Sequence, residues 1–264
     1  MKNRVIYSFF YSSLIYCTMK KIKVCLFVFL IIISFIVFSF AINLYCIREK
    51  ENDNSNLNVI RTSSTPITSH VIVVDGGHGL PDSGAEGLYG TTEEAINLKI
   101  ALKLQKLIEQ SGGIAYLTRS DENGIYSESA KTIKEKKNSD IKNRVEIGNM
   151  DEVEIFVSIH LNKFEDSKYS GWQTFYQENN ENSKCLAECI QESLNNTIDY
   201  PNNRVAKELK DIYIMDHVNK PTVTVECGFL SNEREVQLLK TEEYQNKLAW
   251  GIYIGIQDYF VSIN

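Results

Sequence analysis

The sequence predicts a single α/β domain with a mainly parallel, helix-covered sheet of about six strands, preceded by an N-terminal transmembrane helix. Aliphatic runs that suit strands buried on both faces alternate with helical patterns after residue 70, and this alternation is typical of a parallel sheet. Residues 24–46 carry no charge. About 195 residues remain for the folded part, which is enough to form one core.

The uncharged stretch at residues 24–46 would reach roughly 35 Å as a helix, which is enough to cross a bilayer. Residues 1–23 hold five basic and no acidic residues. The positive-inside rule therefore places them in the cytoplasm and the chain after about residue 47 outside. This predicts a membrane-anchored, extracytoplasmic protein. A cleaved signal peptide has the same order of charges, and a start at Met19 instead of Met1 is a second alternative.

Residues 47–69 are polar and rich in Asn, Ser and Thr, which predicts a linker to a domain at 70–262. The first 65 residues hold 8 of the 28 basic and 3 of the 34 acidic residues, so the remainder holds 20 and 31. This acidic balance argues against nucleic acid as a partner. Cys185, Cys189 and Cys227 lack Cys-x-x-Cys spacing, so neither a disulfide framework nor a cysteine-bound zinc is expected.

The expected elements follow from local patterns. The first strand is expected at residues 70–75, where the β-branched run 71–74 suits a buried strand. A Gly-rich turn then leads to a helix that Thr91 or Thr92 can cap and Gly112 ends. Residues 119–138 are polar and rich in Lys, which predicts a surface loop. We expect the other strands at 114–118, 154–160, 172–176, 211–215 and 222–226. We expect further helices at 140–150, 182–197, 203–210, 232–240 and 242–260.

Four polar side chains lie where this pattern reaches the edge of the sheet. His78 and His160 come at the ends of aliphatic strands, and Glu226 ends the strand TVTVE. The carboxyl ends of parallel strands meet at one edge, where open α/β sheets place their ligands. Glu93 begins the first helix on its apolar stripe, and Glu94, on a more polar face, is the alternative.

Two histidines and one carboxylate match a catalytic zinc site with one position left open for water. Zinc brings the pKa of bound water to about 7 and polarises a carbonyl, and a carboxylate that is not a ligand then takes the proton of the water. We therefore predict Zn²⁺ as cofactor, His78, Glu93 and His160 as metal ligands, and Glu226 as the catalytic residue. A turn that merely contains a histidine is the simpler alternative for His78.

Four blocks of the chain, DGGHGLPDSGA, EEAINLKIALKL, FVSIHLN and VTVECGFLSN, stand in an order that resembles the zinc-dependent N-acetylmuramoyl-L-alanine amidases. The resemblance covers about residues 70–260. By position it implies His78, Glu93 and His160 as metal ligands and Glu226 as the catalytic glutamate. It also implies hydrolysis of the amide between N-acetylmuramic acid and L-alanine in peptidoglycan.

Within this family, the anchor, the single catalytic domain and the stretches SGWQTFY and DIYIM are similar to spore cortex amidases of the CwlD type. Those enzymes act while muramic-δ-lactam is made. The resemblance implies peptidoglycan as substrate, the membrane as a partner through the N-terminal helix, and an activating protein partner. The chain departs from the pattern at Gly76 and Leu80. A vegetative autolysin and a non-catalytic peptidoglycan-binding or partner-docking domain are the alternatives.

Several further residues have two interpretations each. Asp75 is either a partner of a metal ligand or an acid that caps a turn, and Asp82 either matches a family position or serves its own turn. Arg119 and Arg144 either pair with surface acids or contact substrate. The Lys-rich segment 131–142 is expected to be a solvated face.

Overall fold

The computed structural model describes residues 65–263 as an α/β domain around a six-stranded sheet. The strands are β1 (Val71–Gly76), β2 (Ile114–Leu117), β3 (Ile155–Asn162), β4 (Gln173–Gln177), β5 (Lys207–Leu209) and β6 (Thr222–Phe229). The helices are η1 (Leu88–Gly90), α2 (Glu93–Gln110), α3 (Ile133–Gly148), α4 (Glu181–Thr197), α5 (Tyr213–His217), α6 (Glu233–Leu239) and α7 (Glu242–Ser262).

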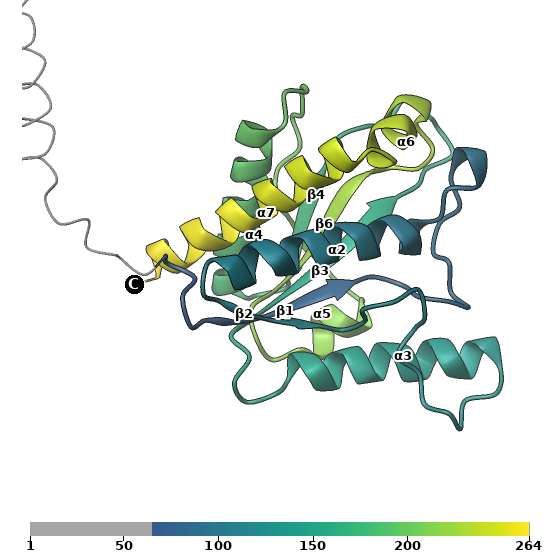
Figure 1. Ribbon diagram of the computed structural model, residues 1–264, viewed down its shortest axis with the longest axis horizontal. Helices are drawn as coiled ribbons and strands as arrows, with labels where there is room; N and C mark the ends of the chain where they lie inside the picture. The colour runs from purple at the N-terminus through teal and green to yellow at the C-terminus, as the bar shows by residue number, and fades with distance from the viewer. Residues whose placement is uncertain (1–64, 264) are drawn as a thin grey trace, which may run out of the picture. The chain divides into compact units, whose positions relative to one another are not determined.

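The strand order is β2-β1-β3-β6-β4-β5, and the sheet is mainly parallel, as the sequence predicts. Only the pairing of β4 with β6 is antiparallel among the strands described. Helices α2, α4 and α7 lie on one face of the sheet, and α3 and α5 lie on the other (Figure 1). The carboxyl ends of β1, β3 and β6 therefore meet at one edge, between the two helical layers.

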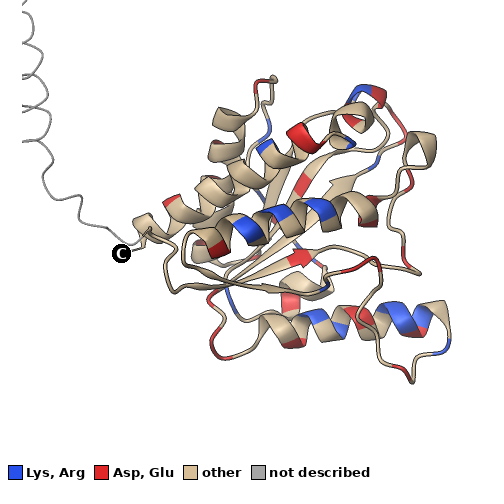
Figure 2. Cartoon of the chain, viewed as in Figure 1, with Lys and Arg blue, Asp and Glu red and all other residues tan. Residues whose placement is uncertain are grey.

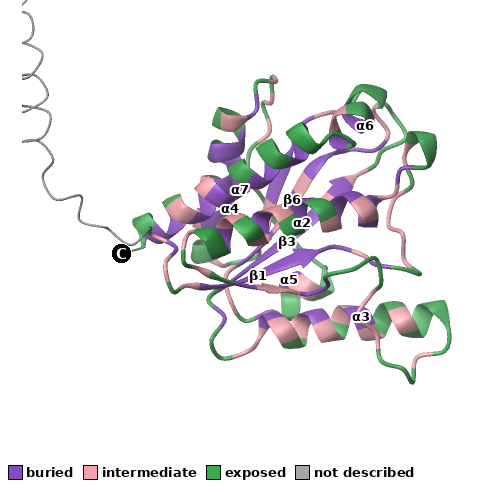
Figure 3. Cartoon of the chain, viewed as in Figure 1, coloured by how far each residue is buried: buried purple, intermediate pink, exposed green. Residues whose placement is uncertain are grey.

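The interior strand β1 contributes to both cores. Ile72 and Val74 pack in the larger core under α2 and α7, whereas Val71 and Val73 pack in the smaller core on the opposite face. This division follows from the alternation of side chains along a strand. All six residues of β1 are buried (Figure 3), which explains why its sequence is a continuous aliphatic run rather than an alternating one.

Helices α4 and α7 approach closely because α7 carries two glycines one turn apart. A Cβ on Gly255 would lie 2.4 Å from Cα of Ile190, and one on Gly251 would lie 2.7 Å from Cδ2 of Leu194. We expect Gly255→Ala to lower the free energy of unfolding by about 1–3 kcal/mol, because the two helices must separate. Urea denaturation measures the change.

The control for this substitution is Asp258→Ala, on the exposed face of the same helix. A surface change of this kind is expected to stay within about 0.5 kcal/mol of the parent. Equal stability of Gly255→Ala and the parent would contradict the close helix contact.

Two expected elements are wrong. Residues 203–210 are not a helix: they are extended, and Lys207–Leu209 pairs in parallel with β4 as the edge strand β5. Residues 211–215 are not a strand, because the single helical turn α5 spans Tyr213–His217. Pairing with β4 outweighs the helix propensity of a short Ala-Lys-Glu-Leu segment. Met215, buried at 3% exposure, anchors the helical turn.

Helix α3 begins well before the expected residue 140, so the polar segment 119–138 is only partly a loop. Thr132 caps the helix by accepting a hydrogen bond from the backbone N–H of Glu135, and the Glu135 side chain accepts one from the backbone N–H of Thr132. This capping box has the sequence signature Thr-x-x-Glu.

The packed domain starts a few residues before residue 70. Ile67 is fully buried and joins the larger core, so the end of the expected linker packs against the domain. The predicted membrane segment at 24–46 lies outside the described residues. Within residues 65–263, no helix has the length and apolar character needed to cross a membrane.

Candidate metal centre and active site

The four predicted site residues come from four elements that meet at the carboxyl edge of the sheet. His78 lies two residues after β1, Glu93 is the first residue of α2, and His160 lies near the end of β3. Glu226 lies on β6 directly opposite His160 in the strand register. The topology thus brings together side chains up to 148 positions apart in the sequence.

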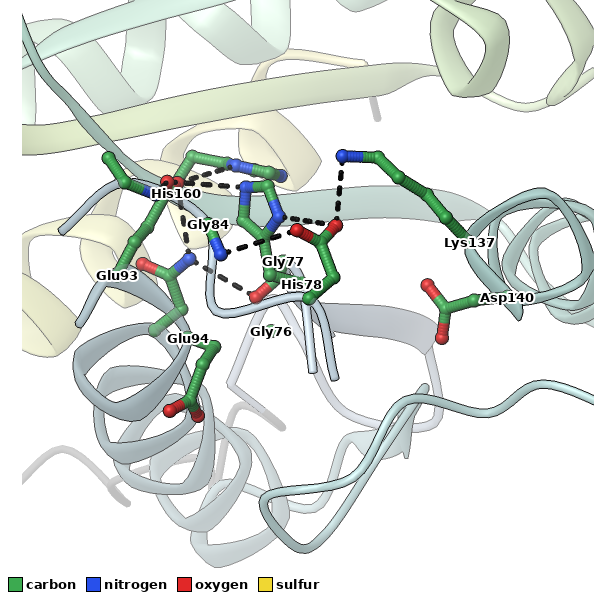
Figure 4. A network of polar contacts seen from close by, with 12 residues as sticks. Gly76, Gly77, His78, Gly84, Glu93, Glu94, Lys137, Asp140 and His160 are labelled. Carbon is green, nitrogen blue, oxygen red and sulfur yellow. Dashed lines mark hydrogen bonds and ion pairs between the residues drawn. The ribbon is translucent and has the colours of Figure 1, made fainter. Parts of the chain in front are cut away.

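His78, Glu93 and His160 each offer one ligand atom, and these atoms lie within 4.8 Å of one another. Nε2 of His78 is 3.2 Å from Oε2 of Glu93, and Nδ1 of His160 is 3.0 Å from Oε1 of Glu93 (Figure 4). Two imidazoles and a carboxylate are a donor set that zinc prefers, at ligand distances of about 2.0–2.2 Å. The arrangement can therefore converge on one cation with small side-chain movements.

Glycines make room for this cluster. A Cβ on Gly77 would lie 2.3 Å from Nε2 of His160, and one on Gly84 would lie 2.6 Å from Oε2 of Glu93. Gly84 also has φ of +68°, a conformation that glycine adopts without strain. The Gly-rich turn after β1 is therefore needed for both its backbone path and the space at the ligands.

The pKa values of His78 and Glu93 depend on each other. Burial alone would lower the pKa of His78, but hydrogen bonds to Asp82 and Glu93 raise it to about 9. Burial alone would raise the pKa of Glu93, but its contacts with His160 and His78 hold it well below its ordinary value. The cluster is thus a carboxylate that stabilises an imidazolium, and a metal ion would replace the proton on His78.

Neighbouring groups hold the candidate ligand side chains in place. Nδ1 of His78 is 3.0 Å from Oδ2 of Asp82, the type of contact that fixes the ring of a metal-bound histidine. The backbone N–H groups of Ala85 and Leu161 donate to the two oxygens of Glu93 at 2.8 and 3.0 Å. Both interpretations of Asp82 hold, because it contacts His78 and its Oδ1 atom accepts a hydrogen bond from the backbone N–H of Gly84 at 3.4 Å within its own turn.

Glu226 faces the cluster from the next strand. Its Oε2 atom is buried and has no hydrogen-bond partner among the described residues. Burial raises the pKa of Glu226 to about 7. A buried carboxyl that lacks a partner is costly, and a pKa near neutrality suits a group that exchanges protons in catalysis.

Asp75 and the two arginines form a buried network beneath the turn that carries His78. Arg144 pairs with Asp75 and with Asp140 and donates to the carbonyl of His78. Arg119 donates to the carbonyls of Gly76, Gly77 and Glu94. The arginines therefore neither pair with surface acids nor serve as exposed substrate contacts, because both are at least 97% buried and their donors are used internally.

Two contributors lie outside the predicted set. Asn97 is fully buried and donates to the carbonyl of Gly77 at 3.2 Å, one helical turn after Glu93. Lys137 lies 3.0 Å from Oδ2 of Asp82. Asn97 has a sequence signal, since a polar residue four positions after Glu93 lies on the same face of the helix. Lys137 has none, because its contact spans 55 positions.

Comparison with known proteins identifies the same family. The family model described as N-acetylmuramoyl-L-alanine amidase matches residues 72–258. A germination-specific N-acetylmuramoyl-L-alanine amidase of Bacillus subtilis (strain 168) is 36% identical over 197 residues, which are 75% of this chain and 82% of the relative.

Two solved structures are similar in fold and sequence. The CwlD amidase from Clostridioides difficile, solved in complex with the GerS lipoprotein, is 50% identical with a TM-score of 0.71, covering 74% of this chain and 100% of that one. An N-acetylmuramoyl-L-alanine amidase from Clostridium difficile 630 is 28% identical with a TM-score of 0.65, covering 75% and 100%. The chain therefore belongs to the N-acetylmuramoyl-L-alanine amidase family.

Proposed function

We propose that this amidase is zinc-dependent, with His78, Glu93 and His160 as the metal ligands and Glu226 as the catalytic residue. The observation that supports this most directly is the convergence of the three ligand atoms within 4.8 Å beside Glu226, whose buried Oε2 atom has no hydrogen-bond partner among the described residues. When bound, zinc would supply Lewis acidity toward the amide carbonyl and toward water.

Glu226 acts first as the base and then as the acid of the hydrolysis. Glu226 takes a proton from the attacking water, whose oxygen forms the new bond to the lactyl carbonyl carbon. The carbonyl carbon–nitrogen bond then breaks, and Glu226 returns the proton to the nitrogen of L-alanine. A pKa of Glu226 near 7 favours both transfers.

The biological setting we propose is the spore cortex, reached by export through the N-terminal segment and tethering there. Similarity to a germination-specific amidase over 82% of its length supports this role. The relative solved with a lipoprotein supports a protein partner for this chain as well.

Incubation of the full-length chain with purified peptidoglycan tests the proposed chemistry. We expect new N-terminal L-alanine, no new reducing ends of the glycan, and loss of the reaction on chelation with recovery on adding zinc. Release of reducing ends without free alanine amines would show another bond to be the target.

The contact of Asp82 with His78 gives a second test of the metal site. We expect Asp82→Asn to weaken zinc binding by about 10- to 100-fold, because the amide no longer holds the His78 ring as an anionic acceptor. Competition with a chromophoric chelator measures the affinity. The control is Asp121→Asn on the exposed loop after β2, and equal affinity of Asp82→Asn and the parent would argue against the orienting role.

A further inference from the structure

A groove leads from the ligand cluster outward between α3 and α5. Its inner hollow, of about 150 Å³, is lined by His78 and His160 together with Ile141 and Tyr213. A second hollow, of about 310 Å³, shares Ile141 and Tyr213 and adds Asn138 and Lys142. Because both hollows are lined by Ile141 and Tyr213, they lie next to each other, and we call the two together the groove.

The acids that line the inner hollow are already paired. Asp75 and Asp140 bind Arg144, and Asp82 contacts His78 and Lys137. None of these carboxylates therefore presents an uncompensated negative charge to the groove.

The two lysines of the groove differ in this respect, because among the described residues Lys137 is paired with an acid and Lys142 is not. Lys137 reaches from α3 toward the cluster and shares Asp82 with His78 (Figure 4). Lys142 lines the outer hollow, and no ion pair of Lys142 is present within residues 65–263. Helix α3 carries five basic and three acidic residues (Figure 2), although the chain after residue 65 has 20 basic and 31 acidic residues. The positive charge is thus a local feature of this wall.

The opposite wall is apolar. Ile212 and Tyr213 are 44% and 40% exposed and line the groove at the start of α5. A wall of exposed apolar side chains facing fixed cations is typical of a site for a small ligand that carries charge on one side.

We propose that this groove binds the peptide side of the substrate and that Lys142 pairs with a carboxylate of that peptide. The inference rests on the proposed amidase reaction, in which one side of the cleaved amide is a neutral glycan and the other is a peptide with free carboxylates. Positive charge beside the metal ligands favours the peptide in this position, because the glycan offers no anion for it to bind. The Lys-rich face of α3 is therefore a binding surface rather than only a solvated one.

Lys142→Gln provides the test because Lys142 is exposed and does not contact the ligand cluster. The full-length protein is assayed on two soluble muramoyl peptides that differ only in whether the peptide carboxylates are free or amidated. We expect the substitution to raise KM about threefold to tenfold on the acidic substrate, and to leave kcat and the amidated substrate unchanged. Lys136→Gln, on the same helix but over the Tyr126 ring, is the matched control.

An equal change in KM on both substrates, or no change on either, overturns the proposal. A second experiment distinguishes a wrong groove from a wrong amidase assignment. The acidic peptide product is titrated onto the zinc-loaded chain and its binding is followed by NMR, because binding of a product needs no catalysis. Binding that Lys142→Gln weakens and Lys136→Gln does not weaken would support the groove even if the chain hydrolysed another bond. If the chain hydrolysed the amide but Lys142→Gln bound the peptide as tightly as the parent, the proposed role of the groove would be wrong.

Discussion

Replacement of Glu226 by glutamine is expected to lower kcat by about 10²- to 10⁴-fold. Glutamine keeps the shape of the side chain but cannot accept the proton of the attacking water. Zinc binding is expected to remain, because Glu226 is not among the three residues whose ligand atoms cluster. Steady-state kinetics on a soluble muramoyl peptide, combined with metal analysis of the same preparation, measures both quantities.

The matched control is Glu94→Gln. Glu94 is also buried, at 6% exposure, and lies next to a ligand in the sequence, but its carboxylate accepts a hydrogen bond from Thr92 instead of facing the cluster. We expect this variant to keep its activity. If Glu226→Gln retained activity within a few-fold of the parent, another group would have to move the proton.

The pH profile gives the same prediction an independent check. The reaction needs Glu226 as carboxylate, and burial raises its pKa. The value of kcat/KM is therefore expected to fall as the pH falls through the pKa of Glu226, because protonation removes the base. Glu226→Gln has no such group, so the residual activity of the variant should lack this limb of the profile.

The positions of the long strands and their mainly parallel arrangement were predictable where the pattern was strong. The runs that end at His78, His160 and Glu226 are aliphatic and β-branched, and such strands are buried on both faces of a parallel sheet. The short elements were not predictable: β5 has three residues and α5 has five. At this length the pairing partner decides the conformation, and local sequence carries little information about it.

The meeting of His78, Glu93 and His160 could be predicted because each has a local signal, such as the apolar stripe that turns Glu93 inward. The buried network of Asp75, Arg119 and Arg144 beneath them could not be predicted. Arg144 donates hydrogen bonds to Asp75, 69 positions away in the sequence, and to the carbonyl of His78. These residues come together only in the folded chain. No periodicity distinguishes such a buried arginine from the lysines around it, so its role emerges only from the packing of α3 against the edge of the sheet.

His160→Ala is expected to weaken zinc binding by more than about 100-fold and to abolish activity. Loss of an orienting group costs about 10- to 100-fold in affinity, and loss of a ligand removes a coordinate bond as well. Glu93 would also lose the partner at 3.0 Å from its Oε1 atom, which leaves a buried carboxylate less well compensated. Metal analysis after dialysis against a weak chelator measures the result.

The control for the ligand variant is His70→Ala, because His70 pairs with Glu154 and lies outside the cluster. Zinc at full stoichiometry in His160→Ala would show that the cluster does not bind the ion.

The pH dependence of zinc binding gives a further test. His78, whose pKa is raised to about 9, must be neutral to bind metal. Zinc binding to the parent should therefore release a proton, and its apparent affinity should fall by up to about tenfold for each pH unit below 9.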